Sequence, residues 1–251
     1  KKMKLTVKSI YDFLDSFAPF STQAEWDNSG LTVGSFDKEV SKIFIALDVT
    51  KNVVEEAKNW GADLVITHHP MIFAPISQVT DNMTVYNAVV SGMSFIAAHT
   101  CLDKAVGGVN TCLAEAVGIK NVIDTEDEFL KIGEIETTSA DKFAECLKKA
   151  LGGSVSYTDN GNPITKVALC SGSGGDLVEI AKALDADALL TGEAKHHEFL
   201  LSEDIGVSLF AAGHYETENI ICEKLKEALL KEFSNQIEIK VNDLKNPIKH
   251  I

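Results

Sequence analysis

Two adjacent histidines, His68 and His69, end a short apolar segment that runs from Asp63 to Thr67 and precede Pro70. Proline cannot donate to a sheet ladder, so the predicted strand must end near the histidines. Open α/β sheets bind their ligands at the carboxyl ends of strands. Consecutive side chains of a regular strand diverge, so the pair suits two metal ions better than one. We therefore expect His68 and His69 to bind metal.

Two other predicted strand ends carry a histidine with an acid four residues later. His99 and Asp103 follow one strand, and His214 and Glu218 follow another. If the residues after each strand form a helix, histidine and acid lie one turn apart on one face. A carboxylate can bridge two ions that lie roughly 3.5 to 4 Å apart. Imidazole with carboxylate suits zinc, iron, manganese or cobalt, and the sequence does not choose among them.

The remaining histidines lack this pattern. His196 and His197 lie where a helix is predicted to begin, so we expect them to be solvated or to support a ligand, with metal binding as the minority interpretation. His250 is interpreted as a polar surface residue or a hydrogen-bonded core residue rather than as a ligand.

A glycine-rich segment, Ser171-Gly-Ser-Gly-Gly175, follows a predicted strand and precedes a predicted helix. Backbone amides in such a position can cradle a phosphate. The segment matches neither GxxxxGK[ST] nor a complete GxGxxG, so two interpretations stay open. It is either a flexible turn or a substrate contact made by Gly172, Gly174 and Gly175. Asp27-Asn-Ser-Gly30 is equally ambiguous, because turn formation alone explains its composition.

The elements that must position these residues alternate between helices and strands. Apolar spacing predicts helices over Val7 to Phe17, Asn52 to Trp60, Val79 to Val90, Val106 to Val117, Ser139 to Leu151, Asp176 to Leu184, Lys195 to Leu201 and Glu216 to Phe233. Strands are predicted near Leu31 to Val33, Lys42 to Leu47, Asp63 to Thr67, Ser94 to Ala98, Leu130 to Glu136, Val155 to Tyr157, Thr165 to Cys170, Ala188 to Thr191, Val207 to Ala211 and Gln236 to Val241. This alternation is typical of an α/β fold with largely parallel sheets.

The pattern repeats once along the chain. Three segments match in the same order: Ile45–Leu47 with Val167–Leu169, Val54–Lys58 with Val178–Lys182, and Ala62–Thr67 with Ala186–Thr191. We therefore predict two related α/β repeats, residues 3–124 and 125–251. Each is expected to contain a mixed, mostly parallel sheet with flanking helices, and the two are expected to face a shared cleft.

The composition excludes several classes of protein. Among 251 residues, 45% are hydrophobic and the net charge is -14, which predicts a soluble globular chain. All 23 basic residues are lysine, and an acidic chain without arginine is a poor reader of nucleic acid. The five cysteines show no paired spacing, which indicates a reducing compartment. No segment approaches the roughly 18 apolar residues of a membrane span, so we expect a cytoplasmic protein.

Four motifs together resemble a known family. They are Asp27-Asn-Ser-Gly-Leu31, Thr67-His-His-Pro70, His99-Thr-Cys-Leu-Asp103 and Gly213-His-Tyr-Glu-Thr-Glu218. The chain resembles, over nearly its whole length, the Nif-three-like family, whose bacterial members are often labelled GTP cyclohydrolase I type 2 homologues. The resemblance implies two intertwined α/β repeats, a two-metal site in the cleft between them, and a toroidal homohexamer.

Carried over by position, the resemblance assigns a role to each candidate ligand. It makes His68 and His214 terminal ligands, His69 a ligand of the other ion, and Asp103 and Glu218 the bridging carboxylates.

Two further residues lie beside the ligands in the motifs. His99 is expected to act as an acid or base, or to support a ligand, rather than to bind metal. Cys101 stands where the family commonly has asparagine, and we expect it to be a packed, inert thiol rather than a soft ligand.

The sequence leaves two functions open. The first is a metal-dependent hydrolase in which two divalent ions lower the pKa of a water and polarise a small-molecule substrate such as a nucleotide, while His99 moves the proton. The alternative is a hexameric metal-binding scaffold, or a metal-handling protein, that binds protein partners without catalysis.

Overall fold

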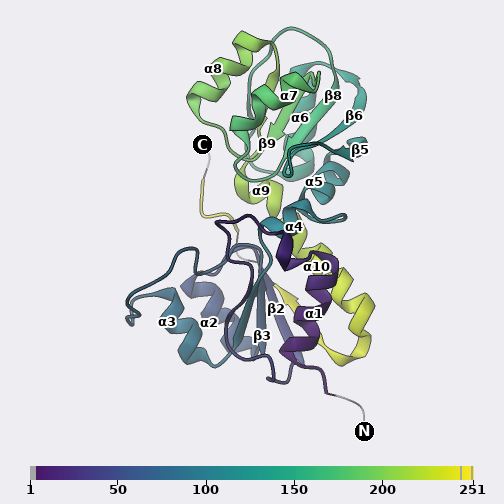
Figure 1. Cartoon of the computed structure of the whole chain (residues 1–251). Helices are drawn as coiled ribbons and strands as arrows, with labels where there is room; N and C mark the ends of the chain where they lie inside the picture. The colour runs from purple at the N-terminus through teal and green to yellow at the C-terminus, as the bar shows by residue number, and fades with distance from the viewer. Residues whose placement is uncertain (1–3, 244, 250) are drawn as a thin grey trace. The chain divides into compact units, whose positions relative to one another are not determined.

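The computed structural model describes residues 4–243, 245–249 and 251, which form two compact units, each with its own sheet (Figure 1). The first unit contains Lys1–Val106 and Ile221–Lys245, and the second contains Gly107–Ile220 and Asn246–Ile251. The units therefore divide the chain differently from the predicted repeats 3–124 and 125–251. The difference arises because the C-terminal helix and strand join the first sheet, while residues 107–124 join the second unit.

The sheet of the first unit has the strand order β1-β4-β3-β2-β11. Its strands are β1 (Gly30–Val33), β2 (Lys42–Ala46), β3 (Leu64–Thr67), β4 (Ser94–Ala97) and β11 (Glu238–Val241). Only β1 is antiparallel to its neighbour; β4, β3, β2 and β11 are mutually parallel. This sheet is therefore mostly parallel, as the alternating pattern predicts, and its parallel strands place their carboxyl ends at one edge.

Helices cover both faces of this sheet. They are α1 (Val7–Phe17), α2 (Lys51–Trp60), α3 (Thr84–Ser91) and α10 (Ile220–Phe233), while the short helix α4 (Thr100–Lys104) follows the carboxyl end of β4. Figure 1 shows α2 and α3 on one side of β2 and β3, and α1 and α10 on the other. Helix α1 begins where Thr6 and Ser9 form a capping box, and α2 ends where Gly61 adopts a left-handed conformation.

The sheet of the second unit has the order β5-β6-β8-β9-β10-β7. Its strands are β5 (Lys120–Asp124), β6 (Lys131–Thr138), β7 (Ser156–Tyr157), β8 (Ile164–Cys170), β9 (Ala188–Thr191) and β10 (Ser208–Ala211). Strands β8, β9 and β10 are parallel, whereas β5, β6 and β7 each pair antiparallel. The expectation of a mostly parallel sheet is thus wrong here. The short connection between β5 and β6 allows only an antiparallel pair.

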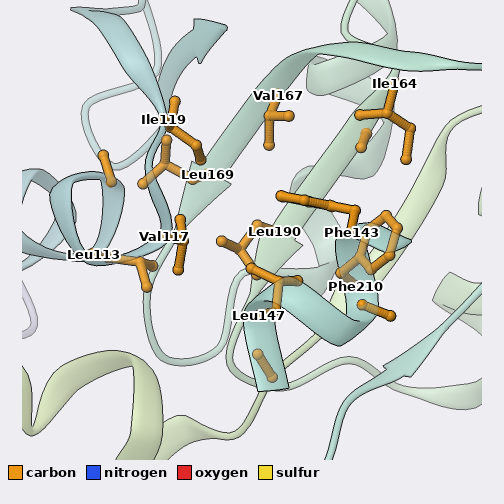
Figure 2. Close-up of a cluster of buried hydrophobic side chains, with 14 of the residues drawn as sticks. Leu113, Val117, Ile119, Phe143, Leu147, Ile164, Val167, Leu169, Leu190 and Phe210 are labelled. Carbon is orange, nitrogen blue, oxygen red and sulfur yellow. The ribbon is translucent and has the colours of Figure 1, made fainter. Parts of the chain in front are cut away.

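Both faces of the second sheet are also covered by helices. They are α5 (Val109–Val117), α6 (Ala140–Leu151), α7 (Val178–Ala183) and α8 (His196–Ile205), while the short helix α9 (His214–Glu218) follows the carboxyl end of β10. Figure 2 shows side chains from α5 and α6, including Leu113 and Phe143, gathered against Leu190 and Phe210 of the sheet. Helices α7 and α8 pack on the other face, where Val178 and Ala181 join a second core cluster.

Most predicted elements are present, and the exceptions have physical reasons. Helix α3 begins at Thr84 rather than Val79, after a turn. The predicted helix over Glu216–Phe233 is two helices, α9 and α10, which meet at Asn219. Strand β5 escaped prediction because its side chains are mostly exposed and give no apolar alternation. Among the described residues, no helix combines the length and apolar character that crossing a membrane requires.

The two units repeat one backbone arrangement. Asp63 donates its amide to the carbonyl of Lys42 and accepts the Lys42 amide on its carboxylate; Asp187 and Lys166 bond to each other in the same way. These contacts make Lys42 equivalent to Lys166. One predicted match is therefore two residues out of register: Ile45–Leu47 with Val167–Leu169. Strand side chains alternate with a period of two, so the shift preserves the buried face and conceals the error.

Candidate metal centre

The first unit brings three histidines together at the carboxyl ends of β3 and β4. Strand β3 is buried along its length, and the ladder extends past it because the His69 amide donates to the carbonyl of Leu47 at 3.0 Å. His68 is fully buried, and His99 follows β4 as the N-cap of α4. One side-chain nitrogen of each of His68, His69 and His99 lies within 4.8 Å of the others. The sequence prediction that the pair lies at a strand end is confirmed.

The rings of the adjacent histidines are each held by an oxygen. His68 Nδ1 lies 2.9 Å from the carbonyl oxygen of Ala98, at the end of β4. His69 Nδ1 lies 2.7 Å from the carboxylate of Asp48, which follows β2. Neighbouring strands therefore orient both rings, and the ring centroids lie 4.8 Å apart.

His99 is paired with a buried aspartate instead of the acid four residues later. Its Nδ1 lies 2.9 Å from Asp27 Oδ1, and the Asp27 side chain is inaccessible to solvent. Asp27 also accepts hydrogen bonds from the amide and hydroxyl of Thr100 and from the hydroxyl of Ser29. Burial opposes ionisation, but the hydrogen bonds from His99 and Thr100 outweigh it and hold the pKa of Asp27 well below its usual range. Asp27 is thus a fixed charge that orients His99.

Asp103, the predicted bridging carboxylate of this unit, faces His68. It lies on α4, is almost buried, and its Oδ1 is 3.5 Å from His68 Nε2. The expected pairing of His99 with Asp103 on one helical face is wrong, because His99 precedes the helix as its N-cap with a non-helical backbone, and its ring turns toward Asp27.

The second unit carries the other histidine and acid, one turn apart on α9. His214 Nε2 lies 3.1 Å from Glu218 Oε2, as the i, i+4 spacing predicts. His214 Nδ1 lies 3.1 Å from Glu193 Oε2 at the end of β9. Glu193 occupies the repeat position of His69. At this position the first repeat has a candidate ligand, whereas the second has the carboxylate that supports His214.

The glycine-rich segment lies close to this pair, but two of its backbone amides donate to side chains of the same unit. The Gly172 amide donates to the Thr217 hydroxyl at 3.2 Å, and the Gly174 amide donates to the Thr191 hydroxyl at 2.8 Å. A Cβ on Gly172 would lie 2.3 Å from Glu218 Oε1. Gly175 is likewise packed, against Glu198. These contacts favour a packing role for the glycines, and a substrate contact by Gly172, Gly174 and Gly175 stays a prediction.

A cavity of about 420 Å³ opens beside His214 within the second unit. Its lining combines hydroxyl, carboxylate and ammonium groups, contributed by Ser156, Ser173, Glu193, Lys195 and Glu216. Such a polar cavity beside a histidine has room for the polar part of a small molecule.

The four histidines share one chemical arrangement. In each ring Nδ1 faces an oxygen, supplied by the Ala98 carbonyl or by the carboxylates of Asp48, Asp27 and Glu193. A neutral imidazole that donates from Nδ1 carries its lone pair on Nε2, which is how proteins present histidine to a metal. With Asp103 and Glu218 nearby in their own units, the donor set fits a divalent ion such as zinc, iron, manganese or cobalt.

The supporting carboxylates of three histidines were missed by sequence reasoning. Asp48 and Glu193 follow strands singly and carry no spacing signal. Asp27 belongs to a motif that turn chemistry explains equally well, although the same motif forms part of the family resemblance. The sequence signal available for Asp27 was its position directly before Asn28 and Ser29 in that motif.

The other singled-out residues are not among the candidate ligands. His196 and His197 are exposed at the start of α8, and His250 lies outside the described residues. Cys101 is buried on α4, and burial raises the pKa of its thiol to about 11. A buried, protonated thiol agrees with the expected packed and inert cysteine.

Known proteins resemble this chain along its whole length. A protein of Campylobacter jejuni named GTP cyclohydrolase 1 type 2 homolog is 34% identical over 99% of this chain and 100% of its own. The GTP cyclohydrolase 1 type 2 of Helicobacter pylori strain 26695 is 30% identical over 98% and 99%. Protein SA1388 of Staphylococcus aureus shares the fold with a TM-score of 0.91 and 26% identity, covering 98% of this chain and 99% of that one. The model of the Duf34/NIF3 (NGG1p interacting factor 3) family matches residues 5–247, and the chain belongs to that family.

Proposed function

We propose that this protein is a metal-dependent hydrolase that binds two divalent ions through His68, His69 and Asp103 of the first unit and His214 and Glu218 of the second. The carrying observation is the orientation of the histidine rings, each held at Nδ1 by an oxygen so that Nε2 presents its lone pair.

Neither unit offers a complete ligand set for two ions. The first supplies two histidines and one carboxylate, and the second supplies one histidine and one carboxylate. By the family resemblance, the two carboxylates, Asp103 and Glu218, would hold the ions together with the three histidines. Bound divalent ions would supply Lewis-acid chemistry, polarising the substrate and lowering the pKa of water.

Proton transfer in the proposed reaction falls to His99. Its Nδ1 is engaged by Asp27, so Nε2 is the atom that accepts and returns the proton. The permanent charge of Asp27 stabilises the imidazolium that forms and keeps the ring from rotating. Because Asp27 acts through His99, it is a positioning residue.

The names of the relatives suggest the substrate class. The Campylobacter jejuni and Helicobacter pylori proteins are named for GTP cyclohydrolase 1 type 2, that is, for hydrolysis of a ring in a guanine nucleotide. We propose a nucleotide or another cyclic C–N compound as the substrate here.

Metal content tests the ligand set. The purified protein should contain about two divalent ions per chain, as a two-metal site requires, measured by mass spectrometry of the elements. Separate His68→Ala and Glu218→Ala variants should each lose metal, while His196→Ala, a histidine exposed on α8, should keep it. Full occupancy in a chain carrying both ligand substitutions would refute the assignment.

Turnover tests the catalytic part. Metal-loaded protein should hydrolyse at least one member of a panel of GTP, other nucleotides and cyclic amides. His99→Ala should abolish this activity while the metal content stays unchanged. Inactivity of the wild type across the panel would instead favour the metal-binding scaffold.

A further inference from the structure

Two exposed aromatic side chains lie beside His99 in the first unit. Trp26 is 61% exposed and Phe73 is 48% exposed, although large aromatic rings are usually buried. Their ring planes are 14° apart, and their centroids lie 6.4 Å apart. The other tryptophan of the chain, Trp60, shows the usual behaviour, because it is partly buried against Phe44 of the core. The exposed pair therefore needs an explanation.

Both exposed rings contact the histidine that we assign to proton transfer. The His99 ring centroid is 5.8 Å from that of Trp26 and 5.3 Å from that of Phe73, and both contacts are edge to face. His99 is itself fixed by Asp27, the residue next to Trp26. A flat apolar surface thus adjoins a titratable group.

The backbone that carries the two rings is tied together. Asn28 donates from its side-chain amide to the carbonyl of Ile72 at 2.7 Å, which links the segment of Trp26 to the segment of Phe73. The Asp27 amide donates to the carbonyl of Ala24 at 2.9 Å. The backbone positions of the two rings are therefore held in advance, which lowers the loss of freedom when a ligand orders the side chains.

We propose that Trp26 and Phe73 form a stacking platform for a planar heteroaromatic ring of the substrate. The inference rests on the proposed function and names the substrate class for the same site. Aromatic faces attract flat π-systems, and stacking tolerates different rings because each offers a π-face. A ring stacked on this platform brings its substituents to His99, where the proton is transferred.

Fluorescence of Trp26 reads the platform without any turnover. The Trp60→Phe background leaves Trp26 as the only indole, since the chain has two tryptophans. GMP and AMP should quench it saturably, whereas ribose 5-phosphate, which lacks the ring, should not. Phe73→Ala should weaken nucleotide binding about tenfold, the size expected for loss of one stacking partner. Phe36→Ala is the matched control, because Phe36 is also partly exposed but packs on Tyr11.

Three results would overturn the platform. One is equal quenching by ribose 5-phosphate and the nucleotides; another is equal affinity in the Phe73→Ala and Phe36→Ala variants. The third concerns the Trp26→Ala variant: its molecular mass by light scattering changes, while its nucleotide affinity by calorimetry does not. That result would make the Trp26 and Phe73 pair a contact between copies of the chain. Metal content is measured on the same samples. Nucleotide stacking without metal would refute the proposed function alone, and metal without stacking would refute the platform alone.

Discussion

Replacing Gly172 by alanine should damage the metal centre from a residue that offers no ligand. Gly172 has a φ of +63°, and an added Cβ would lie 2.3 Å from Glu218 Oε1 and 3.3 Å from His214 Nε2. Ordinary contact begins at 3.4 Å, so the carboxylate must retreat by about 1.1 Å, the difference between 3.4 and 2.3 Å. A displacement of this size takes a ligand out of coordinating geometry.

We expect Gly172→Ala to bind divalent metal about 10 to 100 times more weakly, the range seen when the surroundings of a ligand are altered. The substitution also strains the backbone, because alanine in the left-handed region costs about 1 to 2 kcal/mol. Strain alone should lower the melting temperature by roughly 2 to 8 °C in a chain of this size.

A matched variant separates the clash from the strain. Gly206 ends α8 in the same unit with a φ of +74°, and a Cβ there would meet nothing within 4 Å. Gly206→Ala should therefore show a similar loss of melting temperature and an unchanged metal affinity. Calorimetric titration with zinc or manganese measures the affinities. Equal metal affinities in the two variants would refute the reasoning.

Four further predictions follow from the structure and the family. Because the pKa of Asp27 is lowered in the folded protein, its carboxylate stabilises the fold above about pH 4, and this contribution is lost as the pH falls through the folded pKa. Urea unfolding should therefore give a difference in unfolding free energy between wild type and Asp27→Asn that is constant near neutrality and shrinks in acid. Glu193→Gln should weaken metal binding about tenfold by competition with a chelator, whereas His196→Gln should not. A thiol reagent at pH 8 should label Cys146 rapidly, while buried Cys222, whose burial raises its pKa to about 12, should react only on unfolding. Light scattering should give six times the 27.2 kDa chain mass if the protein is the homohexamer that the resemblance implies.

The elements nearest the chemistry were the easiest to predict from the sequence. The apolar segment before His68 is bounded by Pro70, and the helix over Val7 to Phe17 has both a strong apolar period and a capping threonine. In such places local pattern and tertiary packing agree. The i, i+4 pair of His214 and Glu218 was predictable for the same reason, since one turn of helix fixes their separation.

The support of the histidines could not be predicted, because it depends on contacts far apart in sequence. Asp27 and His99 are separated by 72 residues, and Asp48 and His69 by 21. Nothing in the local composition around Asp48 or Glu193 distinguishes them from other surface acids in a chain with 37 of them. Only the meeting of strand ends in the folded sheet gives these carboxylates a partner.

The division of the chain was hidden by a similar effect. Letters repeat in sequence order, which suggests a single boundary after residue 124. Strand β11, however, pairs with β2, with Glu238 opposite Lys42, and nothing in the local sequence of either strand indicates this pairing.

The position of β11 also has a consequence for synthesis on the ribosome. Strand β2 is apolar over Ile43 to Ala46, and its partner β11 begins only at Glu238, almost 200 residues later. Most of the second unit, Gly107–Ile220, can therefore emerge and begin to fold while β2 is still an unpaired edge. A nascent or truncated chain that stops before Glu238 carries an open parallel edge suited to intermolecular pairing. Strand β11 thus covers the edge of β2, and a chain that lacks β11 should aggregate rather than remain soluble as a shorter protein.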